Sequence, residues 1–209
     1  MALISVPQKF EGNVLKHVRG CFRSSVQKWI TEQKCELRPS KKHGLGLFAT
    51  RDILPYELIT LYPADGVRLW LQDGARTVYI KEFQGMSVDY SAEIPTYKGW
   101  RMEIVGDPNQ ISDPFHLGHM ANDYCQMTRV EMKDIYTKIS LEGMNADISC
   151  VPFEACFREH LWKAHGVWCM KPIKAGEEIY VHYGEDYWIT KAEWEAKLSS
   201  TVVELNCMD

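Results

Sequence analysis

The residues best suited to chemistry gather in one stretch near the C-terminal end, KAGEEIYVHYGEDYW, which runs from Lys174 to Trp188. Glu178 to Tyr183 alternate in the manner of a β-strand, and a Lys-Ala-Gly turn precedes them. Alternation does not explain why two tyrosines, a histidine and a tryptophan crowd together where this strand ends. The cluster has two interpretations, the corner of a hydrophobic core or the wall of an active site.

Two other short motifs could contribute to such a site. Gly44-Leu45-Gly46 has two glycines one residue apart, which lets the backbone approach a ligand closely. It is not a dinucleotide fingerprint, because the third glycine and the flanking strand and helix are missing. Asn122 follows a short apolar run in HLGHMANDYC, where a buried amide needs hydrogen-bond partners. The alternative for Asn122 is an Asn-Asp turn in a loop.

Composition limits the class of protein. The chain has 209 residues, of which 45% are hydrophobic, and this suits one globular domain with a sizeable core or a domain plus appendages. Its 24 Lys and Arg against 28 Asp and Glu give a net charge of -4. This balance disfavours a broad surface for nucleic acid and suits a basic polypeptide partner. No run of about 18 apolar residues and no signal peptide is evident, so we expect no membrane association.

The seven cysteines are scattered and odd in number, which argues against a disulfide framework and for a reducing, intracellular compartment. The densest stretch, Cys150 to Cys169, holds three cysteines and two histidines at spacings that match no common zinc module. We therefore expect no metal site, and we expect Cys150 and Cys169 to pack on strands as small hydrophobic residues.

The pattern along the chain indicates a mainly β fold with short helices, an α+β class. An amphipathic helix is expected over 12–34, a brief helical stretch in FREHLWKAH, and a helix in TKAEWEAKLSSTVVEL after Thr190. Strands are expected in CELRPS, KKHGLGLFATRDILPYELITLY, GVRLW, VYIKEF, GWRMEIVGD, MNADISCVPF and GVWCMKPIKAGEEIYVHYG. The expected organisation is a helical N-terminal extension (1–35), a β-rich body (36–188) and a helical tail (189–209).

Four motifs, KKHGLGLFATRDILPYELITLYPADG, GHMANDYC, MNADISCV and IKAGEEIYVHYG, stand in an order that resembles the SET domain, the fold of most protein lysine methyltransferases. The resemblance covers roughly residues 36–188. It implies small curved sheets with a pseudoknot, here flanked by N-terminal and C-terminal helices. The cysteine-rich pre-SET and post-SET modules of many family members are not evident, so the chain is similar to a small SET protein.

The resemblance implies a role for particular residues. It implies S-adenosyl-L-methionine as the cofactor, S-adenosyl-L-homocysteine as its product, and a cofactor site made of His43, Gly44, Leu45, Gly46, Trp100, Asn122, Asp123, Tyr183 and Trp188. It implies a catalytic group made of Tyr183, Asn122 and Tyr62. The expected wall of the substrate channel consists of Tyr124, Tyr180, Val181 and Tyr187.

Two departures from the family motifs are reciprocal. Asp123 stands where the motif has histidine, and His182 stands where it often has aspartate. This exchange suggests that Asp123 and His182 bridge the crossing segments of the pseudoknot with their roles exchanged. Tyr187 and Trp188 are the expected cover of the channel, with core packing as the alternative for Trp188. Val181 stands where the family often has an aromatic ring, and the degree of methylation stays open.

The sequence thus favours an S-adenosylmethionine-dependent protein-lysine N-methyltransferase acting on a basic tail, with a histone as the first guess. Methyl transfer needs an aligned amine and an apolar channel, and no metal or covalent nucleophile. The substrate class favours the nucleus over the cytoplasm. The alternative is a catalytically weak SET-like module that binds a partner, which the Asn-Asp pair keeps open. A Cys/His hydrolase has no supporting signature, and the target lysine and oligomeric state stay open.

Overall fold

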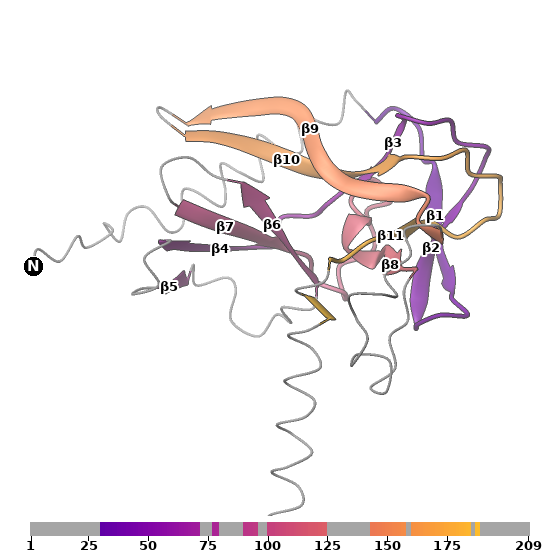
Figure 1. Cartoon of the computed structure of the whole chain (residues 1–209), viewed down its shortest axis with the longest axis horizontal. Helices are drawn as coiled ribbons and strands as arrows, with labels where there is room; N and C mark the ends of the chain where they lie inside the picture. Colours follow the sequence, from indigo (N-terminus) through magenta and orange to yellow (C-terminus); the bar gives the residue numbers. More distant parts are fainter. Residues whose placement is uncertain are drawn as a thin grey trace, which may run out of the picture.

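The computed structural model describes residues 30–71, 77–79, 90–95, 100–124, 143–157, 160–184 and 187–188. The regular secondary structure of this part of the chain is almost entirely strands, in four small sheets (Figure 1), which confirms the mainly β expectation. The C-terminal helix and most of the helix expected over 12–34 lie outside the described residues, and residues 30–34 are not helical. The division at residues 35 and 188 stays a prediction. Among the described residues, no helix has the length and apolarity needed to cross a membrane.

Three of the sheets are antiparallel. In the first, β1 (Cys35–Pro39) pairs with β2 (Leu45–Ala49). In the second, β10 (His160–Cys169) lies between β3 (Leu58–Leu61) and β9 (Ala146–Phe157). The third has the order β5 (Thr77–Tyr79), β4 (Gly66–Leu71), β7 (Trp100–Val105), β6 (Ser91–Pro95).

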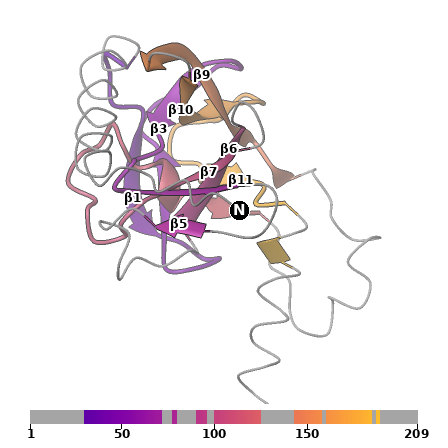
Figure 2. The ribbon, with the colours of Figure 1, turned by 90° about the vertical axis from the view of Figure 1, so that its left-hand side faces the viewer.

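The fourth sheet is a parallel pair at the centre of the fold. A short 3-10 helix, η4 (Gly118–Met120), leads into β8 (Asn122–Asp123), and β8 pairs in parallel with β11 (Tyr180–Val181). In both ribbon views this pair lies below the long β9–β10 hairpin (Figures 1 and 2). It joins two segments that are far apart in the chain.

The segment around β11 crosses between two earlier parts of the chain. Ile179 N–H donates to the carbonyl of Leu47 in β2 at 2.8 Å, and Glu178 forms an antiparallel bridge with Phe48. On its other side, Tyr180 pairs with Asn122 of β8. The C-terminal strand is therefore hydrogen-bonded on both sides, and this crossing corresponds to the pseudoknot implied by the family resemblance.

Asn145 fixes the crossing segment from a third direction. Its Nδ2 donates to the carbonyl of Glu178 at 2.9 Å, and its Oδ1 accepts the N–H of Tyr180 at 2.8 Å. Its own carbonyl accepts the N–H of Met170 at 2.8 Å. Because a buried backbone polar group is costly when unpaired, these bonds hold a strand that has only two ladder residues.

The hydrophobic core surrounds this crossing. Its fully buried members come from β1, β2, β3, β10, β11 and the segments between strands, and they include Cys35, Leu47, Ile53, Ile59, Val167, Cys169, Ile173, Ile179 and Val181. Thr60 in β3 is also fully buried, and its hydroxyl accepts the N–H of Leu117 at 3.0 Å. β3 thereby fixes the segment that leads through η4 to β8.

One local expectation failed and one strand was missed, each for a physical reason. The stretch FREHLWKAH was expected to be helical, but its residues 160–165 belong to β10. There they pair with β9 in a hairpin whose many inter-strand bonds outweigh a weak local helical preference. β6 was not expected, because Ser, Ala, Glu and Pro favour strands little. It forms as an edge strand on β7, where a terminal proline is tolerated.

Replacing Ile179 by alanine tests the crossing as a structural centre. Ile179 is completely buried, so we expect Ile179→Ala to lower the free energy of unfolding by about 2–5 kcal/mol, measured by urea denaturation. Leu54→Ala is the control, since Leu54 is 64% exposed and its loss should change stability by about 0.5 kcal/mol or less. Equal effects of the two substitutions would contradict a core around β11.

Candidate active site

Asn122 joins the glycine turn to the crossing segment. Its buried side-chain amide donates from Nδ2 to the carboxylate of Glu178 at 2.9 Å and lies 3.2 and 3.3 Å from the carbonyls of Leu45 and His43. An amide has only two N–H groups, so these three acceptors share them. The structure thus brings together three of the predicted site motifs.

Glycine is required at the two positions of this turn for different physical reasons. Gly44 has a φ of +49°, in the left-handed region that favours glycine, and a Cβ there would meet nothing within 4 Å. A Cβ on Gly46 would instead lie 2.2 Å from Glu178 Oε1 and 2.7 Å from Asn122 Nδ2. Gly44 shapes the turn and leaves its outer side open, whereas Gly46 lets Asn122 and Glu178 pack against the backbone.

Tyr183 is held at both ends. Its hydroxyl donates to the carbonyl of Ala121 at 2.7 Å, and its backbone N–H donates to Asp123 Oδ2 at 2.9 Å. Burial, with smaller contributions from Tyr187 and the Asp123 carboxylate, raises the pKa of the Tyr183 phenol well above its ordinary value. The hydroxyl is therefore a neutral donor to Ala121 at physiological pH, and its oxygen lone pairs can accept.

Asp123 faces away from Asn122, as neighbouring residues in a strand do. Its side chain is only 2% exposed, and its Oδ2 accepts both the N–H of Tyr183 and the indole N–H of Trp188, each at 2.9 Å. His182 Nδ1 lies 3.8 Å from the same oxygen. The suggested Asp123–His182 bridge therefore has the two groups close together, at a distance longer than a hydrogen bond.

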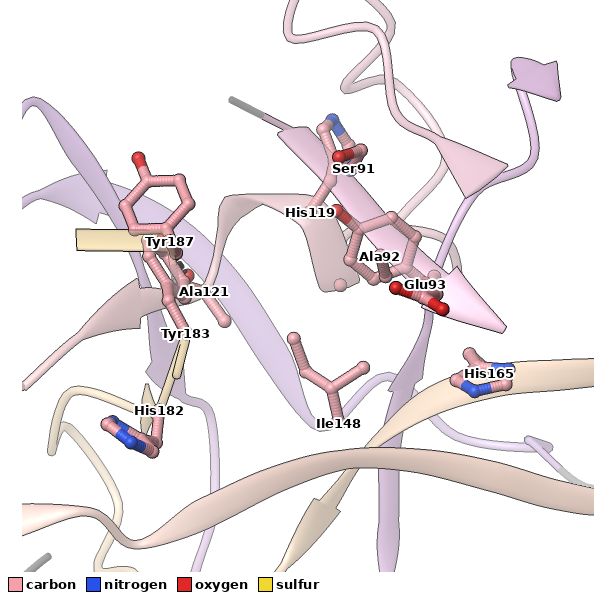
Figure 3. Close-up of a pocket in the computed structure, with 12 residues that line it drawn as sticks. Ser91, Ala92, Glu93, His119, Ala121, Ile148, His165, His182, Tyr183 and Tyr187 are labelled. Carbon is pink, nitrogen blue, oxygen red and sulfur yellow. Dashed lines mark hydrogen bonds between the residues drawn. The ribbon is translucent and has the colours of Figure 1, made fainter. Parts of the chain in front are cut away.

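Beside Tyr183 lies a cavity of about 200 Å³ (Figure 3). Ala121, His182, Tyr183 and Tyr187 lie on one side of the view, and the side chains from β6 and η4 lie across from them. The residues that line it are Tyr62, Ser91, Ala92, Glu93, Gly118, His119, Ala121, Ile148, His165, His182, Tyr183 and Tyr187. It is an enclosure rich in aromatic rings with several polar atoms.

Tyr62 closes part of this cavity. It is 3% exposed, and its hydroxyl donates to the carbonyl of Tyr90 at 2.7 Å. Burial raises the pKa of the Tyr62 phenol well above its ordinary value, so it also stays neutral. Tyr62, Tyr183 and Tyr187 are the three predicted site residues that the structure brings to this cavity.

His119 is an unexpected member of the cavity wall. It is 4% exposed, and burial lowers the pKa of its imidazole from 6.5 to about 4. Its Nε2 lies 3.2 Å from the carbonyl of Asp107, and a carbonyl can only accept, so Nε2 carries the proton. In the part of the chain that the structure describes, Nδ1 is a buried acceptor without a partner.

Other predicted site residues lie elsewhere. Tyr124 and Tyr180 contact each other edge to face at 5.6 Å between ring centres, and the Tyr180 hydroxyl donates to Glu178 Oε2 at 2.7 Å. They lie on the Asn122 side of β8. Val181 is completely buried in the core, and Trp100 begins β7 opposite Leu71. The proposed roles of these four residues stay predictions.

Sequence reasoning missed the wall across from Tyr183, which consists of His119 and the β6 residues Ser91 to Glu93. A histidine in an otherwise apolar run three residues before Asn122 was the one available signal for His119. β6 gave none, since its residues match no strand pattern. Within the described ranges, no group of three His, Cys, Asp or Glu side chains is placed to hold a metal ion.

The two glycines should tolerate alanine unequally. Gly46→Ala forces Asn122 and Glu178 apart, so we expect it to lower the free energy of unfolding by about 1–3 kcal/mol. Gly44→Ala adds only left-handed backbone strain, which costs about 1 kcal/mol. Urea denaturation of both variants checks this order, and a larger loss for Gly44→Ala would contradict the close contact at Gly46.

His119 should make stability depend on pH. Because its folded pKa, about 4, lies below its ordinary 6.5, the unfolded chain binds the proton first as the pH falls. We expect full stability above pH 6.5 and a loss of at most about 3 kcal/mol on acidification towards pH 4. His119→Gln keeps a donor for Asp107 and cannot titrate, so its denaturation curves should show a shallower pH dependence. An unchanged slope would contradict a buried neutral imidazole.

Comparison with known proteins now identifies the fold. No curated protein sequence matches the chain. Two solved structures are similar to it. The first is a candidate histone methyltransferase of Plasmodium falciparum, with 18% identity and a TM-score of 0.39; the match covers 75% of this chain and 98% of that one. The second is the methyltransferase domain of human PR domain-containing protein 2, with 20% identity and a TM-score of 0.42; the match covers 74% of this chain and 80% of that one. The model of the SET domain family matches residues 44–184, from the glycine turn to the residue after Tyr183. That match spans most of the chain, and the chain belongs to the SET domain family.

Proposed function

We propose that this protein is a protein-lysine N-methyltransferase that uses S-adenosyl-L-methionine, and that its substrate is a basic tail such as that of a histone. One observation carries the proposal. The two-residue strand β8 presents Asn122 to the glycine turn and Asp123 to the half-buried Tyr183, so the glycine turn and an aromatic cavity meet at one strand. Membership of the SET domain family makes methyl transfer the expected reaction, and this arrangement supports it here.

The residues around the glycine turn fit the cofactor. The outer side of Gly44 is open, and Leu45 is 40% exposed, so a ligand can lie along this backbone. Asn122 holds the carbonyls of His43 and Leu45 and so fixes the shape of the turn. When bound, S-adenosyl-L-methionine supplies an electrophilic methyl group on a sulfonium. Gly44 to Gly46, Asn122 and Trp188 are the residues we assign to hold it.

The cavity next to Tyr183 suits the side chain of a lysine. Its aromatic walls disfavour the charged ammonium, which must lose a proton before it can attack a methyl group. The Tyr183 hydroxyl donates its hydrogen bond to the carbonyl of Ala121, so the lone pairs of its oxygen stay available as acceptors at a fixed position. Fixed geometry is the main requirement of an in-line displacement. In our proposal Tyr183 therefore positions the amine and the migrating methyl group.

The polar atoms of the cavity favour a basic substrate. The exposed residue Glu93 lines the cavity, and so does neutral His119, whose Nδ1 has no hydrogen-bond partner among the described residues. Both groups accept hydrogen bonds and neither adds positive charge, so a cationic segment meets no repulsion from them. The net charge of -4 also attracts a basic substrate at long range. A histone substrate would place the protein in the nucleus.

The second candidate function is a catalytically weak SET-like module that binds a protein partner. The observation that favours it is Asp123, which replaces the histidine of the family motif beside Asn122. The two candidates differ in what the glycine turn does. A methyltransferase binds the cofactor there, whereas an interaction module can leave the turn empty.

A methyltransferase assay on core histones with labelled S-adenosyl-L-methionine, read by mass spectrometry, tests the proposal. We expect methylated lysine with the unmodified protein. Tyr183→Phe removes the hydroxyl that Ala121 holds, so we expect kcat to fall by about a hundredfold or more, as the loss of one positioned group in an active site typically does.

Calorimetry with the same variant supplies the control. Tyr183→Phe should still bind S-adenosyl-L-methionine, because the glycine turn and Asn122 are unchanged. No cofactor binding by the unmodified protein, together with no transfer to histones or to a peptide array, would contradict the methyltransferase and favour the interaction module. Full activity of Tyr183→Phe would contradict the role of the hydroxyl.

A further inference from the structure

We propose that Asp123 is a positioning residue that ties Tyr183 to Trp188 through a single carboxylate oxygen. In this arrangement Tyr183 and Tyr187 of the cavity wall, and Trp188 packed against them, are held as one unit. The proposal rests on the function proposed above, in which Tyr183 positions the reacting groups. It assigns to Asp123 a part that touches neither cofactor nor substrate.

The first step is the chemistry of the buried carboxylate. The Asp123 side chain is 2% exposed, and a carboxylate is costly to bury unless hydrogen bonds replace its water. Its Oδ2 receives two N–H groups at 2.9 Å, one from the backbone of Tyr183 and one from the indole of Trp188. Hydrogen bonds to an ionised acceptor are roughly twice as strong as neutral ones.

The second step is the turn after Tyr183, which brings Trp188 to the same Oδ2 of Asp123. Gly184 has a φ of +88°, a left-handed conformation that lets the backbone turn directly after Tyr183. Trp188 then lies with its ring nearly parallel to that of Tyr183, at 18° and 6.3 Å between centres. Tyr187 contacts both rings edge to face, at 4.8 and 5.2 Å. The three aromatic residues form one packed group, with Asp123 as the polar anchor of two of them.

The third step concerns the hydrogen bonds of Tyr183. Among its described contacts, Tyr183 has one hydrogen bond besides the bond to Asp123. Its hydroxyl donates to Ala121, two residues before Asp123 in the chain. The segment from Ala121 to Asp123 therefore holds the phenol at one end and the backbone at the other. Without the Asp123 carboxylate, the backbone end of Tyr183 and the indole of Trp188 lose their common acceptor together.

The fourth step explains why a carboxylate stands here in place of the family histidine. A carboxylate oxygen has two lone pairs and can accept two N–H groups at once, whereas a neutral imidazole offers a single lone pair. His182 does not supply a substitute, because its Nδ1 lies 3.8 Å from Oδ2, beyond hydrogen-bond range. A histidine at residue 123 could serve Tyr183 or Trp188, but not both.

The direct test is the indole N–H resonance of Trp188 in nitrogen-15 NMR spectra of the full chain. Trp188→Phe assigns the resonance by removing it. We expect it to shift clearly in Asp123→Ala and in Asp123→His, and to change less in Asp123→Asn, whose amide oxygen also accepts two donors. Asp52→Asn is the matched control, since Asp52 also accepts two N–H groups but its side chain is 58% exposed. An unmoved resonance in Asp123→Ala would overturn the tie.

Kinetics test whether the tie matters for the reaction. We expect Asp123→Ala to lower kcat by about ten- to a hundredfold, with little change in KM for the histone, and Asp123→Asn to recover most of that loss. Trp188→Phe keeps the carboxylate but removes the indole N–H. The fold-decrease in kcat of the double variant, Asp123→Ala with Trp188→Phe, should be smaller than the product of the decreases in the two single variants. Independent, multiplicative losses would overturn the coupling.

The two tests separate this inference from the proposed function. The NMR measurement needs no activity, so it decides on the tie even if the unmodified protein methylates nothing. If Asp123→Ala fails to fold, Asp123→His and Asp123→Asn still decide: a Trp188 resonance that moves clearly in the first and less in the second supports the tie, and a resonance that moves in neither overturns it. A normal kcat in Trp188→Phe would count against it.

Discussion

The parallel pairing of β8 with β11 is the constraint on which the rest of this structure depends. Each strand has only two ladder residues, so the pair cannot be stable on its own. It exists because β2 binds the crossing segment on one side, Asn145 binds it at two atoms, and a completely buried core surrounds it. In return, it brings the glycine turn, the Asn-Asp pair and the C-terminal tyrosines to one place.

The alternation of side chains along β8 divides this place into two environments. Asn122 satisfies backbone carbonyls of the glycine turn and the Glu178 carboxylate, while Asp123 satisfies N–H groups near the cavity. Both side chains are buried, and such groups are retained in folded proteins when hydrogen bonds replace their water. His119 departs from this pattern, because its Nδ1 is buried without a partner in the described part of the structure.

Most of this architecture could be predicted where local sequence and global fold agree. Gly44-Leu45-Gly46, Asn122 and Tyr183 have residue types that only a few environments accept, and their order along the chain matched one fold. The prediction failed where long-range pairing decided the outcome, as in β10, where a helical pattern became a strand of a hairpin. The prediction was also incomplete where a residue's role depends on which side chains it contacts and not on its type. No sequence pattern shows that Tyr180 lies beside Glu178 while Tyr183 lies against Ala121.

The position of the crossing segment in the chain has a consequence for how the protein folds. β1, β2, β3 and β4 follow one another in sequence, but the strand that completes the centre, β11, comes after all the other described strands. Such non-local contacts fold slowly, because a long loop must close before the pairing can form. During synthesis, the edges of β2 and β8 that pair with residues 178–181 therefore lack these hydrogen bonds until that segment has left the ribosome. Until then the site is incomplete, and unpaired strand edges of this kind are open to aggregation or to chaperone binding.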